Sequence, residues 1–381
     1  MERYEWKSAI KANILLLKVA GLWPKGDETY KLNIYTIYTT LSFALFQALH
    51  TSTQIINLFF IYDDLEALTG TIFVLLTKVL AVLKSCFFIK NMKTLKELMV
   101  IVNSDAFQPK DIEQRIIADT NAKFWKFIFV YFWSSSIGAL TFWTIYPIFS
   151  GAYKEYRLPF FAWYPYDVKK SPVYEITYAY QIFCTGFLIM ANVDMDTLIA
   201  ALNMYVGTQL DILCDDLRKL RFSNGKLFFK LRECIKHHKK ILAFADTTSE
   251  FINWIIILQF FTGAVSIGFS MFQLTLVAPF SSEFYSFVFY GVAITCEIFI
   301  YCWFGNEVIV KSGNIVYSAF ESEWTEASVM FQKEMIVFMI NSQKPLHITA
   351  FGLFTLSLDT FTKILKTAWS YFALLHSVGS D

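Results

Sequence analysis

Two long segments of this chain contain no Asp, Glu, Lys or Arg, a pattern typical of membrane spans. They cover residues 32–62 and 127–153. A helix of about 20 apolar residues crosses the hydrocarbon core of a bilayer, which is roughly 30 Å thick. Hydrophobic residues make up 55% of the 381 positions and charged residues only 17%, too apolar a balance for the interior of a soluble domain. The chain is therefore predicted to be a polytopic membrane protein.

The other apolar segments bring the predicted transmembrane helices to seven, so the expected fold is all-α. The predicted spans cover residues 32–62, 65–89, 127–153, 173–202, 251–280, 284–304 and 346–378. A charged helix is expected over 308–341, and the break at Lys344-Pro345 is expected to split the last helical region into a cytoplasmic part and a membrane part. An odd number of spans places the two ends of the chain on opposite sides.

The positive charges of the loops orient these spans, because Lys and Arg are enriched on the cytoplasmic side. Lys and Arg number six in 1–31, seven in 90–126 and nine in 206–249, whereas the opposite connections have none in 61–66, four in 151–172 and none in 281–286. The N-terminus is therefore predicted to be cytoplasmic and the C-terminus extracellular. This topology is the inverse of a G-protein-coupled receptor and argues against that class.

The charge pattern divides the chain into six parts. These are a cytoplasmic N-terminal amphipathic segment (1–31), spans one to four (32–205) with a cytoplasmic linker (90–126) and an extracellular loop (151–172), a cytoplasmic helical segment (206–249), spans five and six (250–305), a second cytoplasmic helix (306–345) and the terminal helix (346–381). The N-terminal segment is expected to form a short helix on the membrane surface that ends near Gly21.

The terminal helix is apolar enough for a membrane and yet carries a polar stripe. At steps of three or four residues, one face collects Asp359, Lys363, Lys366, Thr367, Ser370 and Ser377. A charge that faces lipid costs several kcal/mol, so this face should meet protein or water. It is either a polar seam buried in the bundle or, if copies of the helix surround a symmetry axis, the lining of a pore. Leu374 interrupts the stripe and would make an apolar constriction that gates by dewetting.

The ionisable residues inside the spans give no enzyme signature. No phosphate-binding Gly loop, zinc-protease motif or nucleophile elbow occurs, no metal or cofactor site is predicted, and a net charge of +1 implies no nucleic-acid partner. Lys78 and Lys84 fall in the second span, where Lys84 is expected to snorkel towards the cytoplasm. Glu297 in the sixth span is either a paired buried carboxylate or a functional group, and His237-His238 is interpreted as a solvated face.

Aromatic and small residues alternate in the outer halves of the spans. The aromatic set includes Phe142, Trp143, Tyr178, Phe183, Phe269, Phe287 and Tyr290, and the small set includes Ser135, Gly138, Gly268 and Gly291. Such a mixture either packs the bundle or leaves an apolar cavity for a small hydrophobic ligand with few polar contacts. The sequence leaves both readings open.

The C-terminal part resembles a known family. The residues that carry the resemblance are Cys302-Trp-Phe-Gly-Asn306, Ser312, Ala319-Phe320, Trp324, Gln343-Lys-Pro-Leu346, Thr349-Ala-Phe-Gly352 and Thr362-Lys-Ile-Leu-Lys-Thr-Ala-Trp-Ser-Tyr-Phe372, with Leu22-Trp23-Pro24, Ala162-Trp-Tyr-Pro165 and Ser171-Pro172 earlier in the chain. Together they look like the insect odorant receptor family. The resemblance covers the whole chain and is most specific at its end.

This resemblance implies a tetrameric, odorant-gated, non-selective cation channel in which the terminal helix lines the pore and the cytoplasmic helices anchor the subunits to one another. By position it implies a gate at Leu374, with Val378, Ser370 and Ser377 as further pore residues. It places the ligand pocket in the outer half of spans two to six. The predicted pocket residues are Ser135, Gly138 and Phe142, matched by motif, and Ile72, Phe73, Leu76, Tyr178, Ile182 and Tyr290, chosen by depth.

The segment between spans four and five is shorter than in the shared co-receptor of that family, Orco. The chain therefore resembles an odour-tuned subunit, which would work as a heterotetramer with Orco. Such a subunit would bind a small volatile organic odorant and pass cations. It would lie in the plasma membrane of olfactory neuron dendrites, in contact with membrane lipid. The alternatives are a metabotropic seven-helix chemoreceptor and a gustatory-type channel of the same architecture. A secondary transporter is disfavoured, because neither internal repeats nor broken helices are evident.

Overall fold

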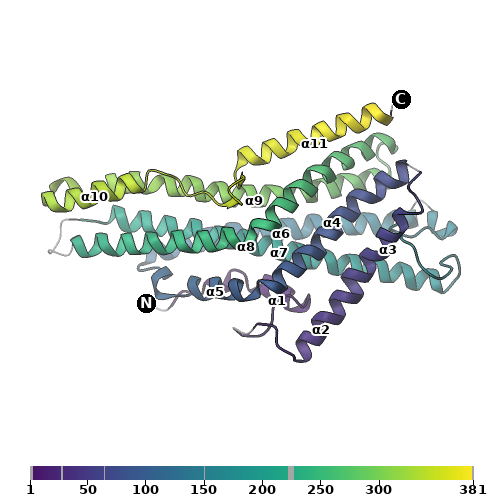
Figure 1. Ribbon diagram of the computed structural model, residues 1–381, viewed down its shortest axis with the longest axis horizontal. Helices are drawn as coiled ribbons and strands as arrows, with labels where there is room; N and C mark the ends of the chain where they lie inside the picture. Colours follow the sequence, from purple (N-terminus) through teal and green to yellow (C-terminus); the bar gives the residue numbers. More distant parts are fainter. Residues whose placement is uncertain (1–2, 27–28, 64, 150, 222–226, 380–381) are drawn as a thin grey trace.

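The computed structural model describes residues 3–26, 29–63, 65–149, 151–221 and 227–379. The described chain is mostly helical, and its long helices run side by side along one axis, with the chain ends towards opposite ends of the molecule (Figure 1). The elements are α1 (Lys11–Val19), α2 (Ile34–Ser42), a π-helical segment (Phe43–Ala48), α3 (Leu49–Leu58), α4 (Leu65–Lys90), α5 (Met92–Val102), α6 (Ile112–Phe149), α7 (Val173–Arg218), α8 (Leu227–Leu276), α9 (Ser282–Phe320), α10 (Val329–Asn341), strands β1 (Thr349–Ala350) and β2 (Phe354–Thr355), and α11 (Leu358–Gly379).

Within the described residues, five helices are long and apolar enough to cross a membrane, namely α4, α6, α7, α8 and α9. The first predicted span corresponds to the run from α2 through the π-helical segment to α3, and the seventh corresponds to α11. The all-helical prediction is confirmed in this coarse form. The count of seven spans and the orientation of the ends stay predictions.

Helix α7 lies at the centre of the bundle, in contact with α1, α4, α6, α8 and α9. Every residue from 193 to 210 is buried, including polar ones. The N-terminal helix is fastened here, because the Asn13 side chain donates to the backbone oxygen of Asp194 at 2.8 Å and to the hydroxyl of Thr197 at 2.7 Å. Helix α1 ends before Gly21, which has a φ of +78°, so the predicted end of this helix is confirmed.

The terminal helix begins at Leu358, twelve residues later than the sequence predicted. Residues 346–357 form an extended connection and the β1–β2 hairpin instead. Phe351 and Gly352 at its turn have φ values of +51° and +67°, which no α-helix accommodates. Ile348, Ala350 and Leu356 are fully buried, so the apolar pattern that suggested a helix serves the packing of the hairpin.

The charged helix predicted over 308–341 is two helices. Helix α9 continues from the sixth predicted span without interruption to Phe320, and α10 begins only at Val329. Ser328 caps α10 by accepting from the backbone N–H of Phe331 at 3.4 Å. The helical run is therefore interrupted at 321–328 as well as at the predicted Lys344-Pro345, since α10 ends at Asn341 and α11 begins only at Leu358.

The predicted cytoplasmic ends of α7, α8 and α9 form, with α10, a second bundle at the end of the molecule away from the C-terminus (Figure 1). His237 of α8 is buried in it, and its Nε2 lies 2.9 Å from the side-chain oxygen of Gln209. Burial, with a smaller contribution from the positive charge of Lys110, lowers the pKa of His237 to about 3. The interpretation of this pair as a solvated face is wrong for His237, because the sequence does not reveal that α7 covers it.

Candidate functional site

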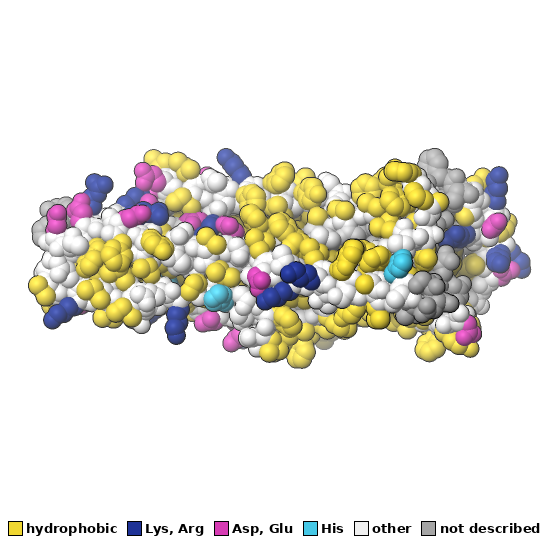
Figure 2. Space-filling model, turned by 90° about the horizontal axis from the view of Figure 1, so that it is seen from above, with side chains coloured by type: hydrophobic (Ala, Val, Ile, Leu, Met, Phe, Trp, Pro, Cys, Tyr) yellow, Lys and Arg dark blue, Asp and Glu magenta, His cyan; other side chains and the backbone are white. Residues whose placement is uncertain are grey.

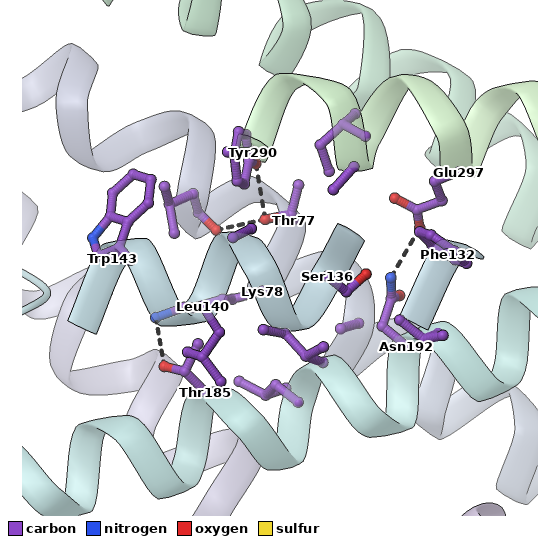
Figure 3. A pocket seen from close by; sticks show the side chains of 18 of the residues that line it. Thr77, Lys78, Phe132, Ser136, Leu140, Trp143, Thr185, Asn192, Tyr290 and Glu297 are labelled. Carbon is purple, nitrogen blue, oxygen red and sulfur yellow. Dashed lines mark hydrogen bonds between the residues drawn. The ribbon is translucent and has the colours of Figure 1, made fainter. Parts of the chain in front are cut away.

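A cavity of about 120 Å³ lies between α4, α6, α7 and α9, roofed by the segment that joins α6 to α7 (Figure 3). Its walls are mostly apolar. The lining residues are Val74, Thr77, Lys78, Ala81, Phe132, Ser136, Ala139, Leu140, Trp143, Phe160, Thr185, Leu188, Ile189, Asn192, Val193, Tyr290, Ala293, Ile294 and Glu297. An apolar cavity of about 150 Å³ accommodates benzene, so this one suits a compact ligand built on a single six-membered ring.

One end of the cavity is formed by the amine of Lys78. Its Nζ lies 3.2 Å from Nε2 of His50 and donates to the hydroxyl of Thr185 at 3.4 Å. It also stands 3.7 Å above the ring of Phe160. Lys78 is 5% exposed and His50 is fully buried. This end therefore holds a lysine surrounded by neutral groups and aromatic carbon.

The other end is formed by Glu297 and Asn192 (Figure 3). Lys84 donates to Glu297 at 2.9 Å, to Asp196 at 2.7 Å and to the side-chain oxygen of Asn192 at 3.0 Å. Tyr301 donates to Asp196 at 2.5 Å. Lys84 is 1% exposed, so the prediction that it snorkels is wrong, and of the two readings of Glu297 the paired buried carboxylate is confirmed.

Aromatic rings close the cavity at the end nearer Lys78. Trp143 of α6 stacks on Phe160 with ring centroids 5.8 Å apart and planes at 12°. Gln181 of α7 holds Phe160 in place, because its amide accepts from the backbone N–H of Phe160 at 3.1 Å and donates to the backbone oxygen at 3.0 Å. The connection between α6 and α7 is thereby fixed as a roof over the cavity.

Helix α11 packs on α8 and α9 with one face and leaves the other exposed. Ile364 and Ala368 are buried, and Gly268 of α8 allows the close approach: a Cβ added there would lie 2.9 Å from the Ala368 oxygen. On the opposite face Asp359 and Lys363 form an exposed ion pair at 2.7 Å. Figure 2 looks onto this side of the molecule, where blue and magenta side chains gather near the start of α11 amid apolar surface.

Comparison with known proteins identifies the family. The family model described as "7tm Odorant receptor" matches residues 64–369. The chain belongs to the insect odorant receptor family. Among its relatives are odorant receptor Or1 of Anopheles gambiae, 25% identical over 100% of this chain and 98% of the relative, and odorant receptor 46a of Drosophila melanogaster, isoform A, 23% identical over 97% and 98%.

The solved insect olfactory receptor OR5 of Machilis hrabei has the same fold as this odorant receptor. It superposes with a TM-score of 0.86 over 98% of both chains, at 20% identity for the complex with eugenol and 21% for a second structure of the same receptor. The comparison supports the helical arrangement over the whole receptor, including the helices that surround the cavity.

Of the nine pocket residues predicted from sequence, Tyr290 lines the receptor's cavity, where its hydroxyl donates to Thr77 at 3.2 Å. Phe73 lies behind it, with ring centroids 4.9 Å apart. Ser135, Gly138 and Phe142 each precede a lining residue of α6 by one position, and Phe142 stacks on Phe289 away from the cavity. The remaining four are outside the lining set: Ile72, Leu76, Tyr178 and Ile182.

The predicted pore residues lie on the exposed side of α11. Leu374 is 61% exposed, and Ser370 and Ser377 are exposed beside it. Val378 belongs to the helix, but its side chain lies outside the described residues. In the single chain Ser370, Leu374 and Ser377 therefore lie together on the exposed face of α11.

Sequence reasoning missed the polar lining of the receptor cavity. Lys78 was noted as a charge in a span, and Thr185 and Asn192 drew no attention, because each looks ordinary until helices from distant parts of the chain meet. Trp143 carried a signal, since it belongs to the aromatic set of the third span. Within the described part of the chain, no group of three His, Cys, Asp or Glu side chains could hold a metal ion.

Proposed function

We propose that this receptor is an odour-tuned subunit of a ligand-gated, non-selective cation channel. It assembles as a heterotetramer with the co-receptor Orco in the plasma membrane of olfactory neuron dendrites. A small volatile odorant binds in the cavity and favours the open state by binding it more tightly than the closed state. Opening widens an apolar constriction at Leu374.

The main support for this proposal is that α11 has one packed face and one exposed polar face. A lipid-facing helix would not hold Asp359, Lys363, Lys366 and Thr367 exposed on one side. Because the other side is already packed on α8, the polar side remains available for water and for neighbouring subunits. Four copies of such a helix around an axis would enclose a wet path, interrupted where Leu374 projects.

The cavity and α11 are in contact with the same helix, α9. Helix α9 supplies Tyr290, Ala293, Ile294 and Glu297 to the cavity and contacts α11 further along. Phe299 of α9 packs edge-on against Phe361 of α11, with ring centroids 5.5 Å apart. A ligand that shifts α9 therefore has a short physical route to the pore helix. The relative solved with eugenol supports a small-molecule ligand.

The gate is tested by Leu374→Ala in receptor co-expressed with Orco. A smaller apolar ring dewets less readily, so we expect a several-fold higher resting cation current under voltage clamp. The matched control is Leu353→Ala, which truncates an exposed leucine in the hairpin turn before α11. An unchanged resting current in Leu374→Ala, at normal surface expression, would contradict the gate.

Blocking G proteins distinguishes the channel from the metabotropic alternative. The channel proposal expects odorant-evoked current with full amplitude and millisecond onset during the blockade. Loss of the current under blockade would favour the metabotropic receptor instead.

A further inference from the structure

We propose that Lys78 selects the ligand of this cavity, favouring compact molecules whose apolar body carries one carbonyl oxygen and excluding amines. The inference rests on the proposed function, since it names the ligand class of the same cavity. The supporting observation is a contrast between the two polar ends of the cavity. At one end Glu297 is paired with Lys84, whereas at the other Lys78 has only neutral partners among the described residues.

The acidic end is already complete. Glu297 accepts from Lys84 and from the amide of Asn192, both at 2.9 Å. Asn192 in turn accepts from Lys84. A ligand amine entering this end would have to displace a buried lysine from a carboxylate. Breaking that buried ion pair is costly. Glu297 therefore closes the cavity and does not attract cations.

The basic end has room for one more acceptor. Among the residues that the structure describes, Lys78 forms no ion pair with a carboxylate. The Lys78 amine already contacts His50 Nε2 and donates to Thr185 Oγ1, and its remaining N–H is left to the face of Phe160, a weak acceptor.

A ligand carbonyl oxygen is a better acceptor than a ring face, so it satisfies this last donor. A carboxylate matches less well, because its second oxygen would be buried among apolar side chains without a donor. An amine also matches less well, because its N–H groups would be buried among apolar side chains without an acceptor.

The size of the cavity restricts the rest of the ligand. Lys78 and Lys84 are six residues apart on α4, which separates the two ends by about 9 Å along the helix axis. Between them the walls are formed by Ala139, Leu140, Leu188 and Ile294, with no charged group. A ring of six carbons bearing one oxygen fills this space and reaches Lys78.

Three compounds of equal heavy-atom count test the proposal: cyclohexanone, methylenecyclohexane and cyclohexylamine. In wild-type receptor with Orco under voltage clamp, we expect cyclohexanone to be about ten-fold as potent as methylenecyclohexane, the range of one hydrogen bond. Cyclohexylamine is expected to evoke no current. In Lys78→Met the two neutral compounds should become equally potent to within about three-fold.

The matched control is Lys93→Met, which removes the same amine from an exposed position of α5 and should keep the preference for the ketone. Currents evoked by methylenecyclohexane in Lys78→Met report that this variant folds. If they are absent, Lys78→Gln decides, because it keeps an N–H donor: a retained preference supports the proposal and a lost one overturns it.

Equal potency of ketone and hydrocarbon in wild type, a preference that survives Lys78→Met, or activation by the amine would each overturn the role of Lys78. These failures differ from failure of the proposed function. A receptor that passes no current with Orco in response to any volatile of a broad panel contradicts the channel proposal, whereas a receptor that responds to other volatiles but not to the ketone contradicts only the assignment of Lys78.

Discussion

Lys78 and Lys84 lie on the same helix, both buried, and meet opposite surroundings. Lys84 sits between two carboxylates, 2.7 Å from Asp196 and 2.9 Å from Glu297. Lys78 meets an imidazole, a hydroxyl and an aromatic ring. The first group is a closed ionic cluster that joins α4, α7 and α9, and the second is an open one that faces the cavity.

This difference shows how a buried residue that stabilises the helix bundle can be told from one that is available to bind a ligand. A buried charge that is fully paired holds helices in register, because any displacement exposes an unpaired partner. A buried amine with only neutral partners keeps a hydrogen-bond donor available for a ligand. The same residue type thus serves stability at one end of the cavity and ligand selection at the other.

The largest effect is expected from Lys84→Met, which leaves Asp196 and Glu297 buried without their cation. Removing one partner of a buried ion pair costs about 3–5 kcal/mol of unfolding free energy. Lys78→Met removes no ionic partner and should cost about 1 kcal/mol or less. Thermal unfolding of both purified variants checks this comparison, and equal destabilisation would remove the distinction between the two clusters.

A second substitution sharpens the comparison. Adding Glu297→Gln to Lys84→Met removes one of the orphaned carboxylates, so we expect it to restore about 1–2 kcal/mol. In wild type the same Glu297→Gln change is expected to destabilise slightly, since Lys84 keeps Asp196. If the two changes add without coupling in the double-mutant cycle, Lys84 and Glu297 do not form one unit.

The smallest effect is expected from Thr185→Val in the open cluster. It deletes one neutral hydrogen-bond partner of Lys78, while the contact with His50 remains, so the loss should be about 0.5–1.5 kcal/mol. The preference for a ketone over its hydrocarbon analogue should persist, because the amine remains. A loss of stability as large as that of Lys84→Met would show that the Lys78 cluster is also structural.

Much of the fold follows from patterns along the chain. Uncharged segments long enough for a bilayer, such as 32–62 and 127–153, required membrane helices. The alternation of polar and apolar residues in α11 required two different surroundings for its two faces, and exposed Lys363 opposite buried Ile364 and Ala368 agrees with it. The family motifs at the C-terminus led to the correct family, as the match over 64–369 confirms.

The errors occurred where local pattern and tertiary contact disagree. The apolar run at 346–357 suggested a helix, but Gly352 turns it into a hairpin. His237 looked solvated until α7 was seen to cover it. The pocket residues matched by motif on α6 each lie one position before a residue that lines the cavity. Most of the residues chosen by depth lie outside the lining set, because depth does not specify which side of a helix meets its neighbours.

The sequence by itself determined that this chain is a helical membrane protein with one polar-faced terminal helix, because hydrophobic length and periodicity are properties of each segment alone. Only the tertiary structure decided which buried charges are paired. Lys78 and Lys84 look alike in the sequence, and their partners come from other parts of the chain, between 28 and 213 residues away, whose positions are set by packing.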